Sequence, residues 1–425
     1  YRVQPFKKGP DYIDPLWLTQ ASASPCFNLD FNTQSREEIK RTFNAHKRLP
    51  DIRFVEGNKG LFDGVDPLGS DCNAALAKQL ELPVILVVDV QGITRGIAPL
   101  VQGYRQFDPD VNIIGVVLNK VAGDRHERKL RQALQEYTDV SVLGAVRKDP
   151  ALMIDERHLG LVPSNEHSFS SSMIETLRTH VEQQVDIDRL IDVLGITAGT
   201  EPEGSEPATG AGRLNIGIAQ DASFGFYYAD DLQEFARQGA RLIPLSLHED
   251  PCLPQLDGLF IGGGFPETHM KELSQNESMR RSVHDAVESG LPVYAECGGL
   301  MYLCREISWQ GKSLPMAGAL PADVVMHERP QGRGYVKLKE NAEHPWVTPT
   351  NRIVPAHEFH HSSLQNIGNE VQFAYDVVRG QGIAEGKDGI VYKHTLASYA
   401  HLRDTDSKHW ISEFLNYIDR TRQEI

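Results

Sequence analysis

The chain has 425 residues, of which 40% are hydrophobic and 24% charged, a balance typical of a globular protein long enough for two or three domains. The net charge of -15 argues against general nucleic-acid binding, because no basic surplus is present to neutralise phosphates. No apolar run of about 18 residues suggests a membrane span. Five scattered cysteines without a CxxC pair favour a reducing cytoplasm and a free thiol.

Apolar strand patterns alternate with helical patterns through the first half of the chain. Strands are predicted at residues 1–6, 83–90, 111–121 and 140–146, and helices at 96–107 and 126–137. Near-continuous apolar strands that alternate with helices predict a doubly wound parallel sheet. A nucleotide-binding unit of this kind has one more strand, loop and helix, ~30 residues, so we expect a further segment ahead of Tyr1.

Residues 197–212, TAGTEPEGSEPATGAG, contain almost nothing large and apolar. This composition predicts an interdomain linker that separates a domain at 1–196 from one at 213–425. After the linker the strand–helix pattern starts again. Strands are predicted at 213–220, 240–246, 258–264 and 291–297, with a helix at 228–238. A second α/β sheet follows from this pattern.

The segment GLPVYAECGGLMYL, residues 290–303, places Cys297 between an apolar strand and a helix. Such an elbow presents its side chain at the carboxyl edge of a sheet, and the amides of the next helix point toward a developing oxyanion. The same position is expected to lower the pKa of a thiol from its usual value of ~8.5. The alternative interpretation is a small buried core residue.

Two further segments favour a nucleophile. The segment GLFIGGGFPE, 258–267, ends a strand in glycines whose backbone N–H groups can complete an oxyanion hole, and GIVYKHTLASYAHLRD, 389–404, supplies a histidine. With the cysteine elbow, these segments resemble class I glutamine amidotransferase domains. The resemblance implies Cys297 as nucleophile, His401 as base, and Gly264 and Gly298 near the oxyanion. Many such domains have a glutamate two residues after the histidine, but this chain has Arg403, so the third member stays open.

Two charged loops of the first half each follow a predicted strand end. They are PFKKGPDYIDP, residues 5–15, and FVEGNKGLFDG, residues 54–64. Lysines beside a phosphate chain and acids beside Mg²⁺ are what phosphoryl transfer requires, although a solvated charged loop is the alternative for each segment alone. The candidate side chains are Lys7, Asp11, Asp14 and Glu56, with Glu56 and Asp11 as the Mg²⁺ candidates.

The ATP site within this numbering is incomplete. No GxxxxGK[ST] motif occurs, and GQGIAEGKDG at 380–389 lacks the first glycine and the final hydroxyl. Asn119 comes after the buried apolar run of the strand predicted at 111–121, where the adenine base could be recognised, but this signal is weak. We expect ATP and Mg²⁺ as cofactors.

The order of the motifs is more specific than any one of them. QPFKKGPDYIDP, EGNKGLFDG, GGGFPE, AECGGLMYL and AHEFHHS closely resemble cobyrinic acid a,c-diamide synthases, from Tyr1 to about His401. The resemblance implies an α/β fold of two doubly wound domains, an N-terminal P-loop-type ATP domain related to dethiobiotin synthetase and a C-terminal class I glutaminase. It implies ATP-dependent activation of the a and c acetates of a corrin-type macrocycle through acyl phosphates, which ammonia converts to amides.

Several alternatives remain at this point. Asn58 and Lys59 replace an apolar pair that is common in the family, which favours its sirohaem-amidating branch, and nickel sirohydrochlorin is a third acidic tetrapyrrole. A CTP-synthase-like amidation of a nucleotide is a further enzyme alternative. A catalytically inactive nucleotide-binding scaffold is the alternative from another class.

The remaining expectations concern metals and partners. The three histidines of HEFHHS, 357–362, favour a structural or substrate-edge role over a metal site, because carboxylates or cysteines at metal spacing are missing. The expected partners are glutamine and an acidic tetrapyrrole, with no nucleic acid and no membrane, and a homodimer is considered as the assembly.

Overall fold

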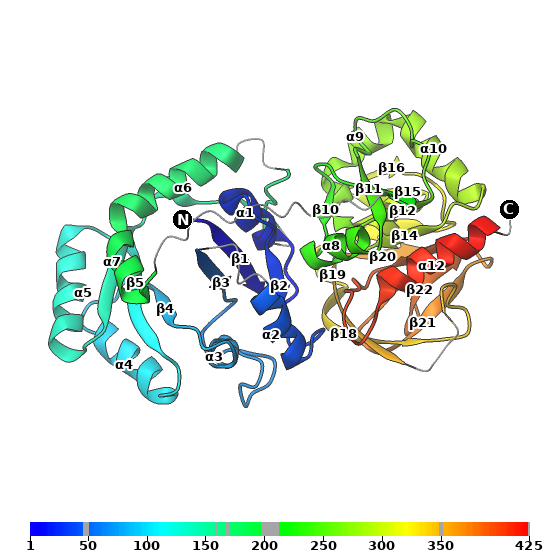
Figure 1. Ribbon diagram of the computed structural model, residues 1–425. Coiled ribbons are helices and arrows are strands. Elements are labelled where there is room, and N and C mark those ends of the chain that lie inside the picture. The colour runs from blue at the N-terminus through cyan, green and yellow to red at the C-terminus, as the bar shows by residue number, and fades with distance from the viewer. Residues whose placement is uncertain (46–50, 158–159, 167–169, 197–211, 348–351, 424–425) are drawn as a thin grey trace. The chain divides into compact units, whose positions relative to one another are not determined.

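The computed structural model describes residues 1–45, 51–157, 160–166, 170–196, 212–347 and 352–423 (Figure 1). The predicted linker at 197–212 lies outside these residues except for Gly212. The chain divides into an N-terminal unit, Tyr1–Phe31 with Ile39–Pro202, and a C-terminal unit, Asn32–Glu38 with Glu203–Ile425. None of the described helices has the length and apolar character needed to cross a membrane.

The N-terminal unit contains two three-stranded parallel sheets, in the orders β2-β1-β3 and β4-β5-β6. The strands up to residue 196 are β1 Val3–Lys8, β2 Phe27–Leu29, β3 Ile52–Glu56, β4 Val84–Asp89, β5 Ile113–Val121, β6 Ser141–Arg147, β7 Glu156–Arg157 and β8 Gly160–Leu161. The helices are α1 Ile13–Ser22, α2 Arg36–Ala45, α3 Asn73–Gln79, α4 Ile97–Phe107, α5 Asp124–Tyr137, η1 Pro150–Leu152, α6 Ser170–Gln184 and α7 Ile187–Leu194. The strands and helices predicted for this half are confirmed, with ends shifted by at most two residues.

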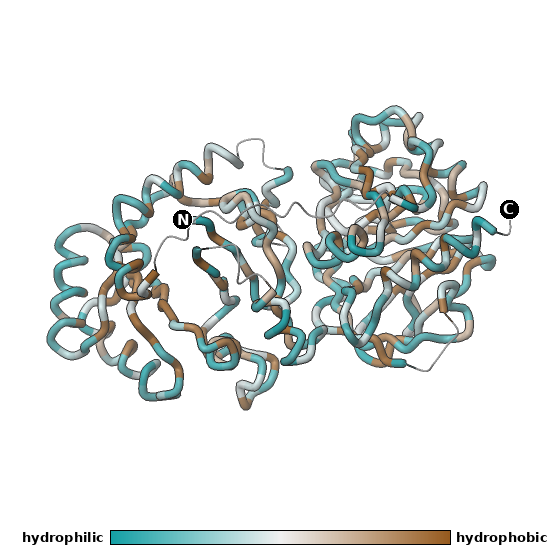
Figure 2. Tube along the Cα trace, viewed as in Figure 1, coloured by the Kyte–Doolittle hydropathy of each residue, from teal (hydrophilic) through white to brown (hydrophobic). Residues whose placement is uncertain are grey.

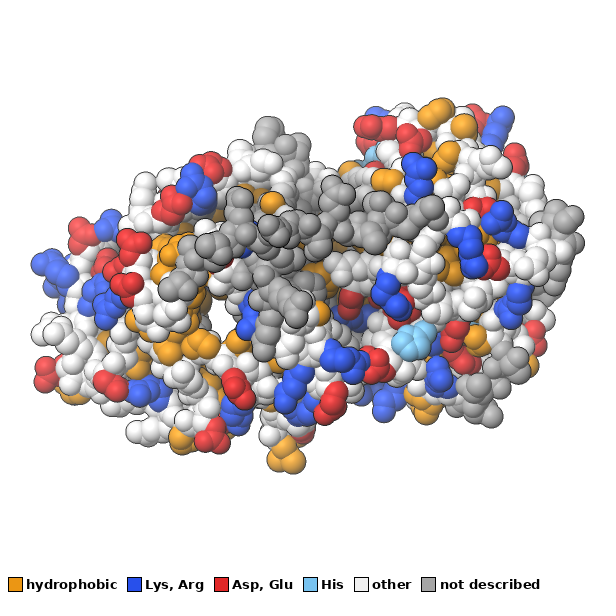
Figure 3. Space-filling view, in the orientation of Figure 1, with side chains coloured by type: hydrophobic (Ala, Val, Ile, Leu, Met, Phe, Trp, Pro, Cys, Tyr) orange, Lys and Arg blue, Asp and Glu red, His pale blue; other side chains and the backbone are white. Residues whose placement is uncertain are grey.

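Each sheet of the N-terminal unit has an open edge. Within the described residues, β3 pairs with β1 alone and β4 pairs with β5 alone. Phe54 of β3 is 48% exposed and Val87 of β4 is 66% exposed, and Figure 3 displays hydrophobic side chains on the surface of this unit. Strands with apolar side chains and an unpaired row of N–H and C=O groups are sites for further strand pairing.

The C-terminal unit is built on a nine-stranded sheet in the order β11-β9-β12-β14-β23-β22-β21-β18-β19. The strands from β11 to β23 in this order run parallel, and the others pair antiparallel. The strands of the unit are β9 Leu214–Ala219, β10 Phe224–Phe226, β11 Ala240–Leu245, β12 Gly258–Ile261, β13 Gly263–Gly264, β14 Val293–Glu296, β15 Glu306–Trp309, β16 Lys312–Pro315, β17 Asp323–Met326, β18 Gly332–Glu340, β19 Ile353–His360, β20 Ser362–Gln365, β21 Gln372–Arg379, β22 Lys387–Tyr392 and β23 Thr395–Ser398. The helices are α8 Ala229–Arg237, η2 Pro266–His269, α9 Met270–Gln275, α10 Glu277–Glu288, α11 Gly298–Leu303 and α12 Trp410–Gln423.

Successive residues of the central strands face opposite sides of this sheet, so both faces are apolar and both are covered. Leu259 and Val293 pack on the side of α9, α10 and α11. Phe260 and Tyr294 pack on the side of α8 and α12, where both rings lie within 5.3 Å of the Trp410 ring, centroid to centroid. Figure 2 shows the hydrophobic strands enclosed by helices whose outer residues are hydrophilic. The carboxyl ends of β12, β14 and β23 are therefore held rigidly side by side.

One buried charge cluster gives a test of the C-terminal unit. Lys408 is 1% exposed, and its ammonium contacts the carboxylates of Glu340 and Glu413. Lys408→Met would leave these carboxylates without a counter-charge, so we expect the free energy of unfolding to fall by about 3–5 kcal/mol. Urea unfolding followed by tryptophan fluorescence measures the loss.

Lys393→Met is the matched control, because Lys393 forms a half-exposed pair with Glu288. Its expected cost is at most about 1 kcal/mol. Equal urea midpoints for the two variants would contradict the role assigned to Lys408.

Candidate active site

Cys297 occupies a sharp turn between β14 and α11. The strand ends at Glu296 and the helix begins at Gly298. The backbone of Cys297 has φ 46° and ψ −100°, which is a strained conformation for a residue with a side chain and one that recurs at nucleophile elbows. The Cys297 N–H donates to the carbonyl oxygen of Ser398 over 2.7 Å. The elbow is thus tied directly to the end of β23.

The two glycines expected at an oxyanion hole lie against each other beside this cysteine. A Cβ on Gly298 would lie 2.8 Å from the carbonyl oxygen of Gly264 and 3.0 Å from its nitrogen. Gly264 has φ 155°, and a Cβ there would lie 1.9 Å from the Ser223 carbonyl oxygen. The Gly298 N–H also hydrogen-bonds the Cys297 thiol. Only glycine fits at either position, and at least one backbone donor faces the sulfur.

The pKa of Cys297 moves opposite to the expectation from the elbow alone. Burial raises the pKa of the thiol, and the nearby charge of Glu267 adds to this effect, while the hydrogen bond from Gly298 opposes it. Cys297 is only 8% exposed, and its Sγ lies 3.8 Å from the Phe359 carbonyl oxygen. The resting side chain is therefore a neutral thiol, and a base is needed to activate it.

His401 follows the neighbouring strand and is held on several sides. Its N–H donates to the His357 carbonyl oxygen over 2.8 Å, and the two imidazoles stack with centroids 4.8 Å apart and planes 14° apart. A Cβ on Gly263 would lie 2.6 Å from the His401 Cε1, so the ring packs directly on that glycine. The ring's Nδ1 lies 3.2 Å from Oε2 of Glu296.

Glu296 is a site residue that our sequence prediction missed. It is 2% exposed, directly precedes Cys297 and ends an otherwise apolar strand. A charged residue in a buried central strand is unusual, and that position was the signal available in the sequence.

Arg403, two residues after His401, forms a buried ion pair with an aspartate. Its guanidinium donates to Asp230 Oδ2 over 2.6 Å and lies 4.8 Å from the centroid of the Tyr228 ring. The Arg403 side chain is fully buried in this pair. The position that carries an acid in many related domains therefore carries a structural cation here.

The histidines of HEFHHS pack against rings. His357 stacks on His401, and burial lowers the pKa of His357 well below its ordinary value, with the neighbouring His401 adding to the effect. His360 stacks on Tyr399, with ring centroids 3.8 Å apart. Across the ranges that the structure describes, no group of three or more His, Cys, Asp or Glu side chains is arranged to hold a metal ion. Of these histidines, His357 contacts the ring of His401 and His360 contacts the ring of Tyr399.

The four charged candidates of the N-terminal unit come together. Lys7 is 3% exposed, and its Nζ lies 2.5 Å from Asp14 Oδ2, 3.5 Å from Glu56 Oε1 and 4.0 Å from Asp11 Oδ2. The pairing of β1 with β3 creates this cluster, because Lys7 and Glu56 are directly opposite in register. Asp11 Oδ1 accepts the N–H groups of Ile13 and Asp14, which fixes the loop before α1.

Burial and charge act against each other in this cluster. Burial opposes the charge on Lys7, but the carboxylates of Glu56 and Asp14 outweigh it and raise the pKa of the ammonium. Burial raises the pKa of Glu56, partly offset by Lys7, and burial together with Asp14 raises the pKa of Asp11. Three acids share one ammonium, and their oxygens are of the ligand type that Mg²⁺ prefers, although among the described residues these side chains are not arranged as a metal-holding group.

Asn119 lies apart from this sheet. It lies in β5, two residues before the strand ends, opposite Asp89 of β4. Its Oδ1 accepts the N–H of Lys120, whose ammonium pairs with Asp89 over 2.8 Å. The structure gives it no link to the Lys7 cluster.

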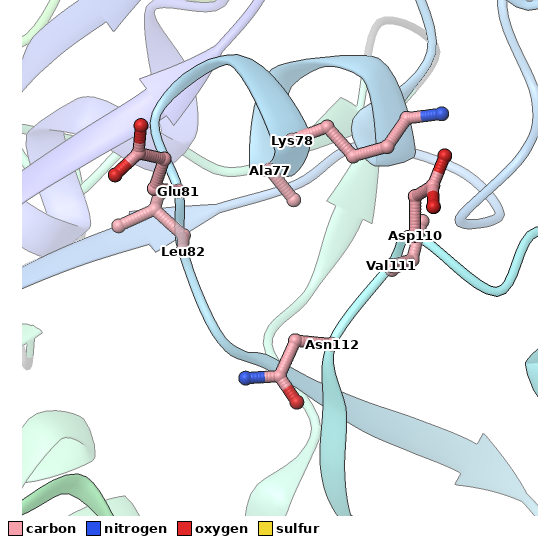
Figure 4. Close-up of a pocket in the computed structure, with 7 residues that line it drawn as sticks. All are labelled: Ala77, Lys78, Glu81, Leu82, Asp110, Val111 and Asn112. Atoms are coloured by element: carbon pink, nitrogen blue, oxygen red, sulfur yellow. The ribbon is translucent and has the colours of Figure 1, made fainter.

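Two surface hollows lie at the amino ends of strands. Figure 4 shows one of about 400 Å³ before β4 and β5, lined by Ala77, Lys78, Glu81, Leu82, Asp110, Val111 and Asn112. The other, of about 320 Å³, includes His394, which directly precedes β23. Open α/β sheets bind ligands at the carboxyl ends of their strands, where Cys297 and Lys7 lie, so neither hollow is the candidate site.

Comparisons with known proteins agree with this division. Residues 215–407 match a CobB/CobQ-like glutamine amidotransferase domain, and residues 23–155 match an AAA domain. Three relatives are named cobyrinate a,c-diamide synthase. The protein from Magnetococcus marinus is 43% identical over 96% of this chain and 89% of its own length. Those from Methanosarcina acetivorans and Listeria innocua are 39% and 38% identical, each over 95% of this chain and over 86% and 89% of their own lengths. On this near full-length similarity, the chain belongs to the cobyrinate a,c-diamide synthase family, a family of glutamine-dependent amidating ligases.

Proposed function

We propose that the protein converts the a and c acetate side chains of cobyrinate to amides, with glutamine as the nitrogen donor and ATP as the activating substrate. The near full-length similarity to proteins named cobyrinate a,c-diamide synthase carries this proposal. In one unit, a cysteine and a histidine follow the carboxyl ends of the adjacent strands β14 and β23, and in the other an ammonium contacts several carboxylates. These two sets of residues support the proposal, because the reaction needs one site to release ammonia and one to activate a carboxylate.

In the C-terminal unit, Cys297 is the nucleophile and His401 the base. The imidazole takes the proton from Sγ as the sulfur attacks the side-chain amide carbon of glutamine. The oxyanion forms beside the N–H of Gly298 and the backbone of Gly264, which are rigid because neither position tolerates a side chain. The proton passes to the departing ammonia, and water then cleaves the γ-glutamyl thioester to glutamate and the free thiol.

In the N-terminal unit, the acetate is activated as an acyl phosphate. A carboxylate is a poor electrophile, whereas an acyl phosphate has a good leaving group that ammonia displaces. In this proposal Lys7 contacts the transferred phosphoryl group, and its ion pairs with Asp11, Asp14 and Glu56 orient the ammonium. Glu56 and Asp11 would hold Mg²⁺, whose positive charge would offset that of the phosphates.

A further parallel strand beside the open edges of β3 and β4 completes the nucleotide site. The exposed apolar side chains of these edges, Phe54 and Val87, support this part of the proposal. Such a strand leads into the phosphate-binding loop in doubly wound nucleotide sites.

The sirohaem alternative rests on Asn58 and Lys59, which replace an apolar pair that is common in the family. The hydrogen bonds of Asn58 give a structural reason for a polar residue at its position. Its Oδ1 accepts from Lys8 Nζ over 3.3 Å, and its N–H donates to Asn73 Oδ1 over 3.2 Å. Asn58 therefore serves the loop itself, and only the exposed Lys59 is free to face a different macrocycle.

Substrate choice can be measured directly. With ATP, Mg²⁺ and glutamine, we expect mass spectrometry to detect two acid-to-amide conversions on cobyrinate and fewer on sirohaem or nickel sirohydrochlorin, because cobyrinate is the substrate named for the relatives. Preferential amidation of sirohaem would overturn the substrate assignment and leave the chemistry intact.

Cys297→Ala tests the glutaminase assignment. We expect glutamine-dependent amidation to be lost, because no other nucleophile lies at the elbow, while amidation driven by ammonium salts stays within about twofold of wild type. Assays of glutamate release and amide formation measure the two activities. A wild-type protein that releases no glutamate, with or without ATP and tetrapyrrole, would favour the inactive-scaffold alternative.

Glu56→Gln tests the charge cluster with ammonium as the donor, so that the glutaminase plays no part. The neutral amide is a weaker ligand for a hard cation, so we expect the Mg²⁺ concentration for half-maximal amidation to rise about 10–100-fold. Glutamate release should not change.

Glu127→Gln is the matched control, because Glu127 pairs with Arg131 on the surface of α5. An unchanged Mg²⁺ dependence in Glu56→Gln would exclude Glu56 from the metal site.

A further inference from the structure

The Glu296 carboxylate is anchored at one oxygen and directed at His401 with the other. Oε1 accepts the Tyr294 O–H over 2.6 Å and the Leu402 N–H over 2.9 Å. Oε2 lies 3.2 Å from His401 Nδ1. The Leu402 donor belongs to the residue after His401, so one carboxylate holds both the imidazole and the backbone that carries it.

This contact determines the tautomer of His401. A carboxylate has acceptor sites only, so the contact with Nδ1 requires the proton to be on that nitrogen. Nε2 of the neutral ring then carries no proton and is the nitrogen that can accept one. A neutral, buried Cys297 thiol needs this form of the ring as its partner.

Stacking on His357 and packing on Gly263 limit rotation of the His401 ring. Arg403, at the position where many related domains place an acid, is paired with Asp230 and is itself a cation. Glu296 is thus the acid that contacts the imidazole of His401, and it comes from the residue directly before the nucleophile.

We propose that Glu296 is the positioning residue of the glutaminase site, which fixes the Nδ1–H tautomer of His401 so that Nε2 can take the proton of Cys297. This inference rests on the proposed roles of Cys297 and His401.

Glu296→Gln is a sharp test because Oε1 already accepts from two donors. The amide oxygen of glutamine must take that place, so its NH₂ group faces Nδ1 of His401. Nδ1 then becomes the acceptor, and the ring is held with its proton on Nε2, the tautomer that cannot accept from a thiol. We expect kcat for glutamate release to fall about 10²–10⁴-fold with KM for glutamine changed less than about threefold.

The other variants separate positioning from packing. Glu296→Ala removes the contact without imposing the wrong tautomer, so we expect it to be no worse than Glu296→Gln. A purely structural role predicts the reverse order, since glutamine is the better isostere. Glu296→Asp keeps the charge and should recover part of the lost kcat. Glu288→Gln, a surface carboxamide replacement, should match wild type.

Amidation driven by ammonium salts is measured in every variant of the full chain, and its retention reports an intact fold. The inference is overturned if Glu296→Gln keeps kcat within about threefold of wild type, or if Glu296→Ala is the more impaired of the two. Loss of activity in Cys297→Ala together with a fully active Glu296→Gln would refute only the positioning role. A wild-type protein without glutaminase activity would instead refute the proposed function.

Discussion

The parallel pairing of β14 with β23 is the contact on which the glutaminase site depends. Glu296 lies opposite Ser398 in this register, and the Cys297 N–H continues the ladder to the Ser398 carbonyl oxygen. The thiol and the imidazole therefore follow the carboxyl ends of adjacent strands. A shift of one residue would turn Glu296 to the other face of the sheet and remove its contact with His401.

Buried polar groups stabilise the short segment that links β23 to the imidazole. Asp388 is fully buried, and its carboxylate accepts the N–H groups of Tyr399 and Ala400, each over 3.1 Å. Glu296 accepts the N–H of Leu402, two residues after Ala400. Burying two carboxylates costs free energy, but each of them accepts several hydrogen bonds. A buried carboxylate whose acceptor sites are occupied by backbone N–H groups fixes the backbone more firmly than apolar packing would.

Much of this architecture could be predicted from the sequence because its signals are local. Apolar strands, helical periodicity and the glycines around Cys297 indicated the sheets and the elbow. The grouping of Lys7 with Glu56 followed from two loops that leave neighbouring strand ends. Glu296 was missed because its role depends on a residue 105 positions away. The predicted direction of the Cys297 pKa shift was wrong. An elbow motif indicates the turn, but it does not reveal how deeply the sulfur is buried by strands that come later in the chain.

The covered sulfur has a consequence for the enzyme's tolerance of oxidants. Peroxides react with thiolates that they can reach, and burial both raises the pKa of Cys297 and leaves only 8% of the residue exposed. Cys252, by contrast, is exposed and would meet a diffusing peroxide first. In the absence of glutamine, burial therefore protects the Cys297 thiol from oxidation. Sulfenic acid formation at the elbow requires the residues that bury Cys297 to move away from the sulfur.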